Sequence, residues 1–169
     1  MNALLRPGLP WQRAMTVNDL GEVLAIEVAS YSFPWSRGNF IDSLAAGYRA
    51  EMRLDAQGEC LGYSVAMPGF EEMHLLNLTV APRHQRQGHG RAMLQLLCEA
   101  ARQCGDHKLW LEVRDSNDGA RRLYQQFGFE DVGRRRHYYP AALGRREDAV
   151  VMSLALNGAT GAGAPDALD

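Results

Sequence analysis

Cysteine is scarce in this sequence. The three cysteines are Cys60, Cys98 and Cys104, with no Cys-x-x-Cys pair and no matching cluster of histidines. A secreted disulfide framework uses an even set of cysteines, and a structural zinc site needs closely spaced Cys or His ligands. We therefore expect reduced thiols in a cytoplasmic protein, with neither a disulfide frame nor a metal site.

Long apolar runs and an excess of one charge are also missing. No segment approaches the ~20 apolar residues that a membrane helix needs, and residues 1–10 lack the apolar core of a signal peptide. The formal net charge is −2 and the pI is near 6.2, which argues against general binding to nucleic acid or a membrane surface. We expect a cytosolic protein with no nucleic-acid or membrane partner.

The remaining composition is that of one ordinary globular domain. The chain has 169 residues, of which 46% are hydrophobic and 22% charged, enough for a proper core. Residues 1–13 are expected to form an irregular arm and residues 14–156 a single domain. Residues 157–169, rich in Gly and Ala, are expected to be a disordered tail.

Hydrophobic periodicity predicts alternating strands and helices. Strands 75–80 and 108–114 are joined by a long helix, so they should run parallel, whereas strands joined by short turns pair antiparallel. The first helix should turn Leu20, Val23, Leu24, Glu27 and Val28 towards a sheet. Helices are expected at residues 19–29, 37–46, 91–104 and 118–127, and strands at residues 13–15, 49–54, 60–66, 75–80, 108–114, 129–133 and 148–154.

A turn rich in hydrogen-bond donors follows strand 75–80. Pro82 ends the strand, and the segment Gln85–Gly90 places two glycines where a helix begins. Free N–H groups and the helix dipole at that point suit a phosphate or pyrophosphate, although a Gly-x-Gly also starts many helices for conformational reasons alone. A dinucleotide fingerprint is excluded because Met93 stands where a third Gly or Ala is needed, and a Walker Gly-Lys-Ser/Thr is absent.

Two residues could carry proton transfer. Glu112 interrupts an otherwise apolar strand, where a carboxylate is costly unless it is paired, for instance with Arg114 on the same face, or used. Desolvation would raise its pKa, as a general base near neutral pH requires. Tyr124 lies on the inner face of helix 118–127, either as packing or as a proton donor to a leaving thiolate.

Three further segments each allow two interpretations. Phe33 and Trp35 either pack on the core or form an aromatic wall beside a substrate pocket. The run 134–139, Arg-Arg-Arg-His-Tyr-Tyr, is either a nucleic-acid patch or a loop with tyrosines lining a peptide site, and the net negative charge favours the loop. Glu71 and Glu72 at a pocket rim are either a solvated turn or an attraction for a cationic substrate.

Several segments together resemble the GNAT family of N-acetyltransferases, and within it the enzymes that acetylate the N-terminal alanine of a small-subunit ribosomal protein. The similarity covers about Met15 to Leu156. It implies an α+β fold with a mostly antiparallel twisted sheet of about six or seven strands, a splayed parallel pair in the middle and about four flanking helices. The segments are Phe33–Ser36, Leu75–Val80, Gln85–Gly90, Leu109–Arg114, Ser116–Asn117, Leu123–Phe129, Arg135–Pro140 and Glu147–Ala149.

The resemblance also implies a role for individual residues. Backbone groups of Leu78, Thr79 and Val80 would hold the pantetheine and thioester of acetyl-CoA, and Asn117 would touch this co-substrate. Glu112 matches the family's base and Tyr124 its acid. His89 replaces an aliphatic residue, which need not matter if only its backbone makes contact. The pyrophosphate would lie on Arg86, Gln87, Gly88, His89, Gly90 and Arg91, and the acceptor beside Trp35, Tyr138 and Tyr139.

The implied reaction is direct acetyl transfer to the N-terminal segment of a protein, with no metal. Two alternatives stay open: an acetyltransferase for a lysine side chain or a small amine, and a non-catalytic acyl-CoA-binding module. An α-amine has a pKa of ~8 and lysine one of ~10.4, so the α-amine is roughly 3 kcal/mol easier to deprotonate. This difference favours an N-terminal acceptor.

Overall fold

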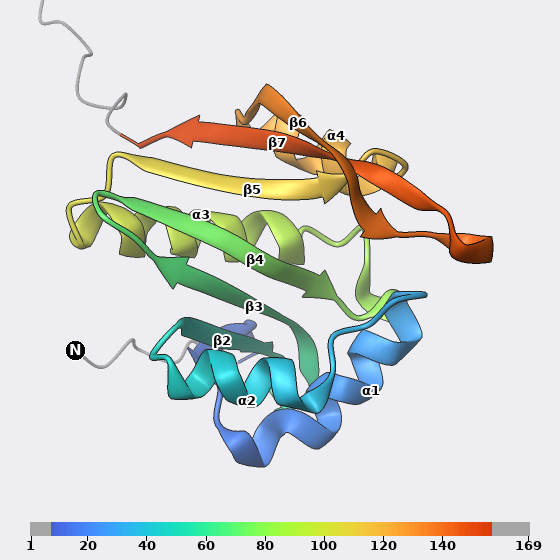
Figure 1. Ribbon diagram of the computed structural model, residues 1–169. Coiled ribbons are helices and arrows are strands. Elements are labelled where there is room, and N and C mark those ends of the chain that lie inside the picture. Colours follow the sequence, from blue (N-terminus) through green and yellow to red (C-terminus); the bar gives the residue numbers. More distant parts are fainter. Residues whose placement is uncertain (1–7, 157–169) are drawn as a thin grey trace, which may run out of the picture.

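The computed structural model describes residues 8–156 and shows one mixed sheet covered by helices on both faces (Figure 1). Helices α1 and α2 pack on one face through a core cluster that includes Leu20 and Phe40, and α3 and α4 pack on the other through a cluster that includes Leu94 and Tyr124. The predicted α+β class is confirmed. In chain order the elements are β1 (Trp11–Ala14), α1 (Leu20–Ser30), α2 (Arg37–Ala45), β2 (Arg49–Leu54), β3 (Cys60–Pro68), β4 (Glu72–Val80), α3 (His89–Gln103), β5 (Lys108–Arg114), α4 (Asp118–Phe127), β6 (Glu130–Pro140) and β7 (Arg146–Ala155).

The sheet has the order β1-β2-β3-β4-β5-β7-β6, and within residues 8–156 its one parallel pair is β4 with β5. That pairing covers Glu72–Leu75 and Lys108–Leu111. Beyond it the two strands diverge towards their carboxyl ends, while β5 stays paired with β7 as far as Arg114 (Figure 1). The predicted splay in the middle of the sheet is therefore present.

Several boundaries differ from the prediction, among them those of β1 and β6. Strand β1 starts at Trp11, which pairs with Leu54, so the strand begins two residues before its predicted start, within the predicted irregular arm. Strand β6 runs to Pro140 instead of ending near residue 133, because its last part pairs with β7 across register shifts at Asp131/Gly133 and Arg135/Tyr139. Such irregularities interrupt the alternation by which a strand is recognised. The arm before residue 8 and the predicted tail at 157–169 lie outside the described residues.

A β-bulge in β4 changes which side chains face α1. Val65 of β3 lies opposite Asn77 and Ala66 lies opposite Leu75, which leaves Leu76 as an extra residue. Leu75 belongs to the core cluster beneath α3, whereas Leu76 packs with the cluster beneath α1 and α2. A bulge shifts the alternation of the strand by one residue. Polar Asn77 is thereby directed towards α1.

Capping residues fix where the helices beside the splay begin and end. Ser36 caps α2 by accepting from the Asn39 N–H at 3.1 Å, and Asn117 caps α4 by accepting from the Ala120 N–H at 3.2 Å. Gly128, at a φ of 120°, ends α4. Helix α4 thus begins directly after β5, at the edge of the splay. None of the helices within residues 8–156 is long and apolar enough to cross a membrane.

Gly62 of β3 has no room for a side chain. A Cβ at this position would lie 2.5 Å from the Thr79 carbonyl oxygen and 3.1 Å from Met93 Cε. We expect Gly62→Ala to lower the free energy of unfolding by about 1–3 kcal/mol, because the contact is with backbone that cannot turn away. Urea unfolding measures this change. Gly21→Ala is the control, since a Cβ there meets no atom within 4 Å. An unchanged unfolding midpoint for Gly62→Ala would contradict the close approach of β3 to β4.

Candidate active site

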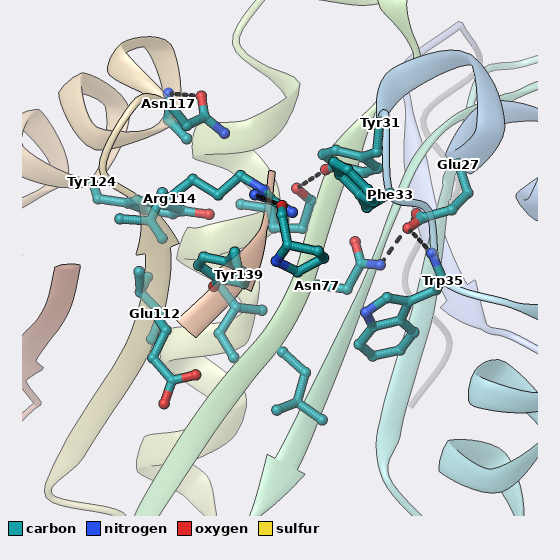
Figure 2. Close-up of a pocket in the computed structure, with 17 residues that line it drawn as sticks. Glu27, Tyr31, Phe33, Trp35, Asn77, Glu112, Arg114, Asn117, Tyr124 and Tyr139 are labelled. Atoms are coloured by element: carbon teal, nitrogen blue, oxygen red, sulfur yellow. Dashed lines mark hydrogen bonds between the residues drawn. The ribbon is translucent and has the colours of Figure 1, made fainter. Parts of the chain in front are cut away.

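A cavity of about 320 Å³ occupies the splay between β4 and β5 (Figure 2). The carboxyl-terminal halves of these strands form its base, and the connection between α1 and α2, the start of α4 and the end of β6 form its walls. Both predicted proton-transfer residues, Glu112 and Tyr124, line it. Residues predicted from distant parts of the chain are therefore gathered at one site.

The predicted phosphate turn forms the amino end of α3. Gly88 adopts a φ of 86° and Arg86 a φ of 60°, so the chain turns sharply before the helix begins at His89. The first helical hydrogen bond is made by Ala92 to the Gly88 carbonyl, and the N–H groups before it face out of the helix end. Gly90 is buried, and a Cβ there would lie 3.0 Å from Leu123 Cδ2. The turn has the geometry of an anion site.

His89 uses its side chain in a way that the sequence did not reveal. Its Nδ1 accepts a hydrogen bond of 3.0 Å from Nε of Arg53 on β2. Desolvation lowers the pKa of His89, and the charge of Arg53 and the nearby His84 lower it further. The imidazole is thus held neutral against β2, and its backbone N–H remains at the helix end.

Glu112 is buried and paired, with its side chain 7% exposed. Its partner is Arg135 of β6, whose Nε lies 3.0 Å from Oε1, while His74 Nε2 lies 3.9 Å away. Desolvation lowers the pKa of His74, so Arg135 is the cation that compensates the carboxylate at neutral pH.

The alternative pairing of Glu112 with Arg114 is not formed. Arg114 Nη1 instead contacts Glu147 Oε1 at 2.8 Å and donates to the Pro140 carbonyl at 2.8 Å. The end of β6 lies over the carboxyl end of β5, and this tertiary contact supplies both the partner of Arg114 and that of Glu112.

Tyr124 enters the cavity from α4 and is buried against the core. Its ring packs edge-on against Phe129 with centroids 5.5 Å apart. Desolvation raises the pKa of the Tyr124 phenol, so the group stays protonated at neutral pH. A protonated phenol and a buried carboxylate therefore line the same cavity.

Aromatic side chains form the walls above the base. Trp35 packs on Phe40, with ring centroids 5.2 Å apart, and it also lines the cavity, so the packing interpretation and a position in the cavity wall are compatible. Arg114 bridges the two walls, with Cζ 4.5 Å from the Tyr139 ring and 5.5 Å from the Phe33 ring. This part of the cavity is thus bounded by aromatic rings and one guanidinium.

Other predicted residues take different positions. Leu78 and Asn117 line the cavity, and the Asn117 side chain also caps α4. Tyr138 lies beside Glu112: desolvation raises the pKa of its phenol, and the interaction with the Glu112 carboxylate raises it further. Thr79 faces α1, where its hydroxyl lies 2.7 Å from that of Tyr31. Of the two tyrosines, Tyr139 therefore lines the cavity, whereas Tyr138 lies beside the Glu112 carboxylate.

Residues of the two charged segments form ion pairs within the protein. Arg134 of the basic run pairs with Asp115 at 3.1 Å and approaches Asp148 at 3.6 Å. Glu72 pairs with Lys108 at 3.1 Å, at the amino end of β4 and outside the cavity lining. The rim position suggested for the Glu71-Glu72 turn is therefore wrong for this cavity, because the site lies at the opposite end of β4.

A buried polar network beside the cavity was missed. Glu27 of α1, 1% exposed, accepts from the Trp35 N–H at 2.9 Å, from the Asn77 amide at 3.2 Å and from the Tyr63 hydroxyl. The Thr79 hydroxyl donates to Asn77 Oδ1 at 2.7 Å. The sequence did contain one signal for this network, namely a glutamate within the predicted apolar face of α1. Val28, predicted on the same face, is 64% exposed.

Comparisons with known proteins agree with this geometry. Residues 20–129 match the model of the acetyltransferase (GNAT) family. The [ribosomal protein bS18]-alanine N-acetyltransferase of Escherichia coli K12 is 36% identical over 144 residues, covering 85% of this chain and 96% of the relative. The crystal structure of the ribosomal-protein-S18-alanine N-acetyltransferase from Escherichia coli superposes with a TM-score of 0.80 at 33% identity, covering 95% of this chain and 99% of the other. The protein yncA of Salmonella typhimurium, solved with its cofactor acetyl-CoA, shares the fold with a TM-score of 0.69 at 22% identity, over 94% and 99% of the two chains.

Proposed function

Since this chain belongs to the GNAT family of acetyltransferases, we propose that it transfers the acetyl group of acetyl-CoA to the α-amine of an N-terminal alanine in a ribosomal protein of the bS18 type. Relatives whose names state this activity align with this chain over nearly their whole length. The observation that carries the proposal is the cavity at the splay, because a carboxylate and a protonated phenol both line it, and the start of α3 packs against α4, the helix that supplies the phenol.

The residues at the cavity suit acetyl-CoA, the co-substrate of this family. The outward N–H groups at the start of α3 suit a pyrophosphate, Gly88 leaves the backbone unobstructed, and Gly90 lets the helix start pack closely on Leu123. Arg86 and Arg91 add positive charge at the same helix end. The exposed backbone of β4 at the splay, around Leu78, would hold the pantetheine and the thioester. When bound, acetyl-CoA supplies the activated acetyl group.

Glu112 and Tyr124 fit the two proton transfers. Glu112, directly or through one water, would take a proton from the acceptor's ammonium and leave a nucleophilic amine. The amine attacks the thioester carbonyl, and a backbone N–H near Thr79 or Val80 would stabilise the oxyanion. Tyr124 would then give its proton to the departing sulfur as the C–S bond breaks, and the extra proton of the acylated nitrogen would return to the phenolate, directly or through water. The raised pKa of Tyr124 ensures that the proton of the phenol is present at neutral pH.

Short peptides test the acceptor. We expect acetyl transfer to a peptide that begins with a free alanine, and none to the same peptide blocked at its N-terminus but containing lysine. Mass spectrometry of the products locates the acetyl group. Transfer to the blocked lysine peptide alone would replace the proposed acceptor with a lysine side chain. Binding of acetyl-CoA with no transfer to peptides or small amines would indicate an acyl-CoA-binding module.

A further inference from the structure

Glu27 is a second carboxylate that lines the cavity, and the proton-transfer scheme does not use it. It comes from α1, whereas Glu112 comes from β5, and the two side chains lie on opposite sides of β4 (Figure 2). Glu27 is 1% exposed, so water does little to stabilise a charge there. A buried carboxylate beside a binding cavity needs a physical reason.

The hydrogen bonds of Glu27 suit its ionised form. One oxygen, Oε1, accepts from the Trp35 N–H, and the other, Oε2, accepts from the Tyr63 hydroxyl and the Asn77 amide. The Asn77 amide is oriented by the Thr79 hydroxyl, which donates to its Oδ1. All three contacts bring a hydrogen towards the carboxylate, as an acceptor-only group requires.

Within residues 8–156 this carboxylate has no positive partner. Among the ion pairs formed by residues 8–156, Glu112 has Arg135 and Glu147 has Arg114, but none includes Glu27. Its three donors are neutral. A buried charge that is hydrogen-bonded but not neutralised attracts a cation more strongly than one already in an ion pair.

We infer that Glu27 determines specificity by attracting the positively charged amine of the acceptor into the cavity, while Glu112 serves for its deprotonation. This inference rests on the proposed function, in which the acceptor enters as an ammonium. The two carboxylates then have separate tasks, because Glu112 is already neutralised by Arg135. Glu27 also holds the Trp35 backbone, so the charge and the aromatic wall are placed by the same side chain.

Peptide binding is measured in the presence of desulfo-CoA, which lacks the thioester. This separates the attraction of the amine by Glu27 from turnover. The probes are a peptide that begins with alanine and the same peptide with the alanine amino group replaced by hydrogen. We expect the wild-type protein to bind the amine peptide at least about tenfold more tightly at pH 7, and Glu27→Gln to bind both equally, since a charged hydrogen bond gives about 10–100-fold. Glu22→Gln is the matched control, because this α1 carboxylate bonds the Cys60 N–H and does not line the cavity.

The pH dependence of peptide binding is a second test of the role of Glu27. Between about pH 7 and pH 9 the acceptor's α-amine, with an ordinary pKa of ~8, loses its charge. We expect wild-type affinity for the amine peptide to fall about tenfold over this range and that of Glu27→Gln to stay nearly constant. The groups around Glu27 and the cavity do not obscure this change, because desolvation lowers the pKa of His74 and raises the pKa values of Tyr31, Tyr63, Tyr124 and Tyr139.

The outcomes separate charge from structure. Loss of the amine preference in Glu27→Gln and its return in Glu27→Asp, with desulfo-CoA affinity unchanged in both, supports the inference. A preference that persists in Glu27→Gln, or that disappears instead in Glu112→Gln, overturns it while leaving the proposed acceptor in place. Weaker binding of both peptides by the same factor in Glu27→Gln shows a purely structural role and also overturns it. If the wild-type protein binds neither peptide, the proposed acceptor is wrong and the inference is overturned with it.

Discussion

Replacement of Glu112 by glutamine is expected to lower kcat for acetyl transfer by about 10²–10⁴-fold, the usual contribution of a positioned general base. The amide keeps the size of the side chain and its place beside Arg135, but it cannot take a proton. The affinity for CoA should not change, because the turn proposed to hold the pyrophosphate lies at the start of α3 and not on β5. Steady-state kinetics and CoA titration measure the two effects.

Arg135→Met is the matched control for Glu112→Gln. It removes the same ion pair from the other side and leaves the carboxylate in place. If the ion pair only stabilises the end of β6, the two variants should lose similar activity. If Glu112 is the base, Arg135→Met should retain far more turnover than Glu112→Gln. Equal losses, or lost CoA affinity in Glu112→Gln, would contradict the assigned role.

Removal of the Tyr124 hydroxyl is expected to have the second large effect. Tyr124→Phe keeps the ring against Phe129, so the fold should be retained, but it removes the proton for the departing sulfur. We expect kcat to fall by about 10²-fold or more, with little change in CoA affinity. Tyr31→Phe is the control, because that hydroxyl also lies at the cavity but contacts Thr79. An equal loss in both variants would remove the case for Tyr124 as the acid.

The raised pKa of Tyr124 also predicts the alkaline behaviour of the wild-type enzyme. The acid works only when protonated, and desolvation moves its deprotonation above the ordinary value of 10.0. Loss of the Tyr124 proton should therefore not limit kcat below about pH 10. A fall in kcat at lower pH that is absent in Tyr124→Phe would show that the phenol titrates earlier than its burial allows.

The order of strands and helices could be predicted because the signals are local. The apolar strand 75–80, the glycines of the following turn and the helix to Cys104 specify a crossover unit, and a crossover requires β4 and β5 to be parallel. Glu112 stood out for the same reason, as a carboxylate within an apolar strand. Its isolation was visible in the sequence, and so was its need for a partner.

The partners could not be predicted, because they are contacts between distant segments. Arg135 reaches Glu112 only after β6 has folded back along β7, and its register shifts are not visible in the sequence pattern. Glu27 and Asn77 are fifty positions apart and meet because the bulge in β4 turns Asn77 towards α1. Position in the chain therefore predicted which elements carry the chemistry, while packing decides what each charge contacts.

The most direct test of the central claim is the site of acetylation on a whole protein. Unacetylated bS18 incubated with this enzyme and acetyl-CoA should gain one acetyl group, and peptide mass spectrometry should place it on the α-amine of the N-terminal alanine. Glu112→Gln should leave the protein unmodified over the same time. Acetyl groups on lysine side chains with a free N-terminus, or an unmodified protein in the presence of wild-type enzyme, would contradict the proposed function.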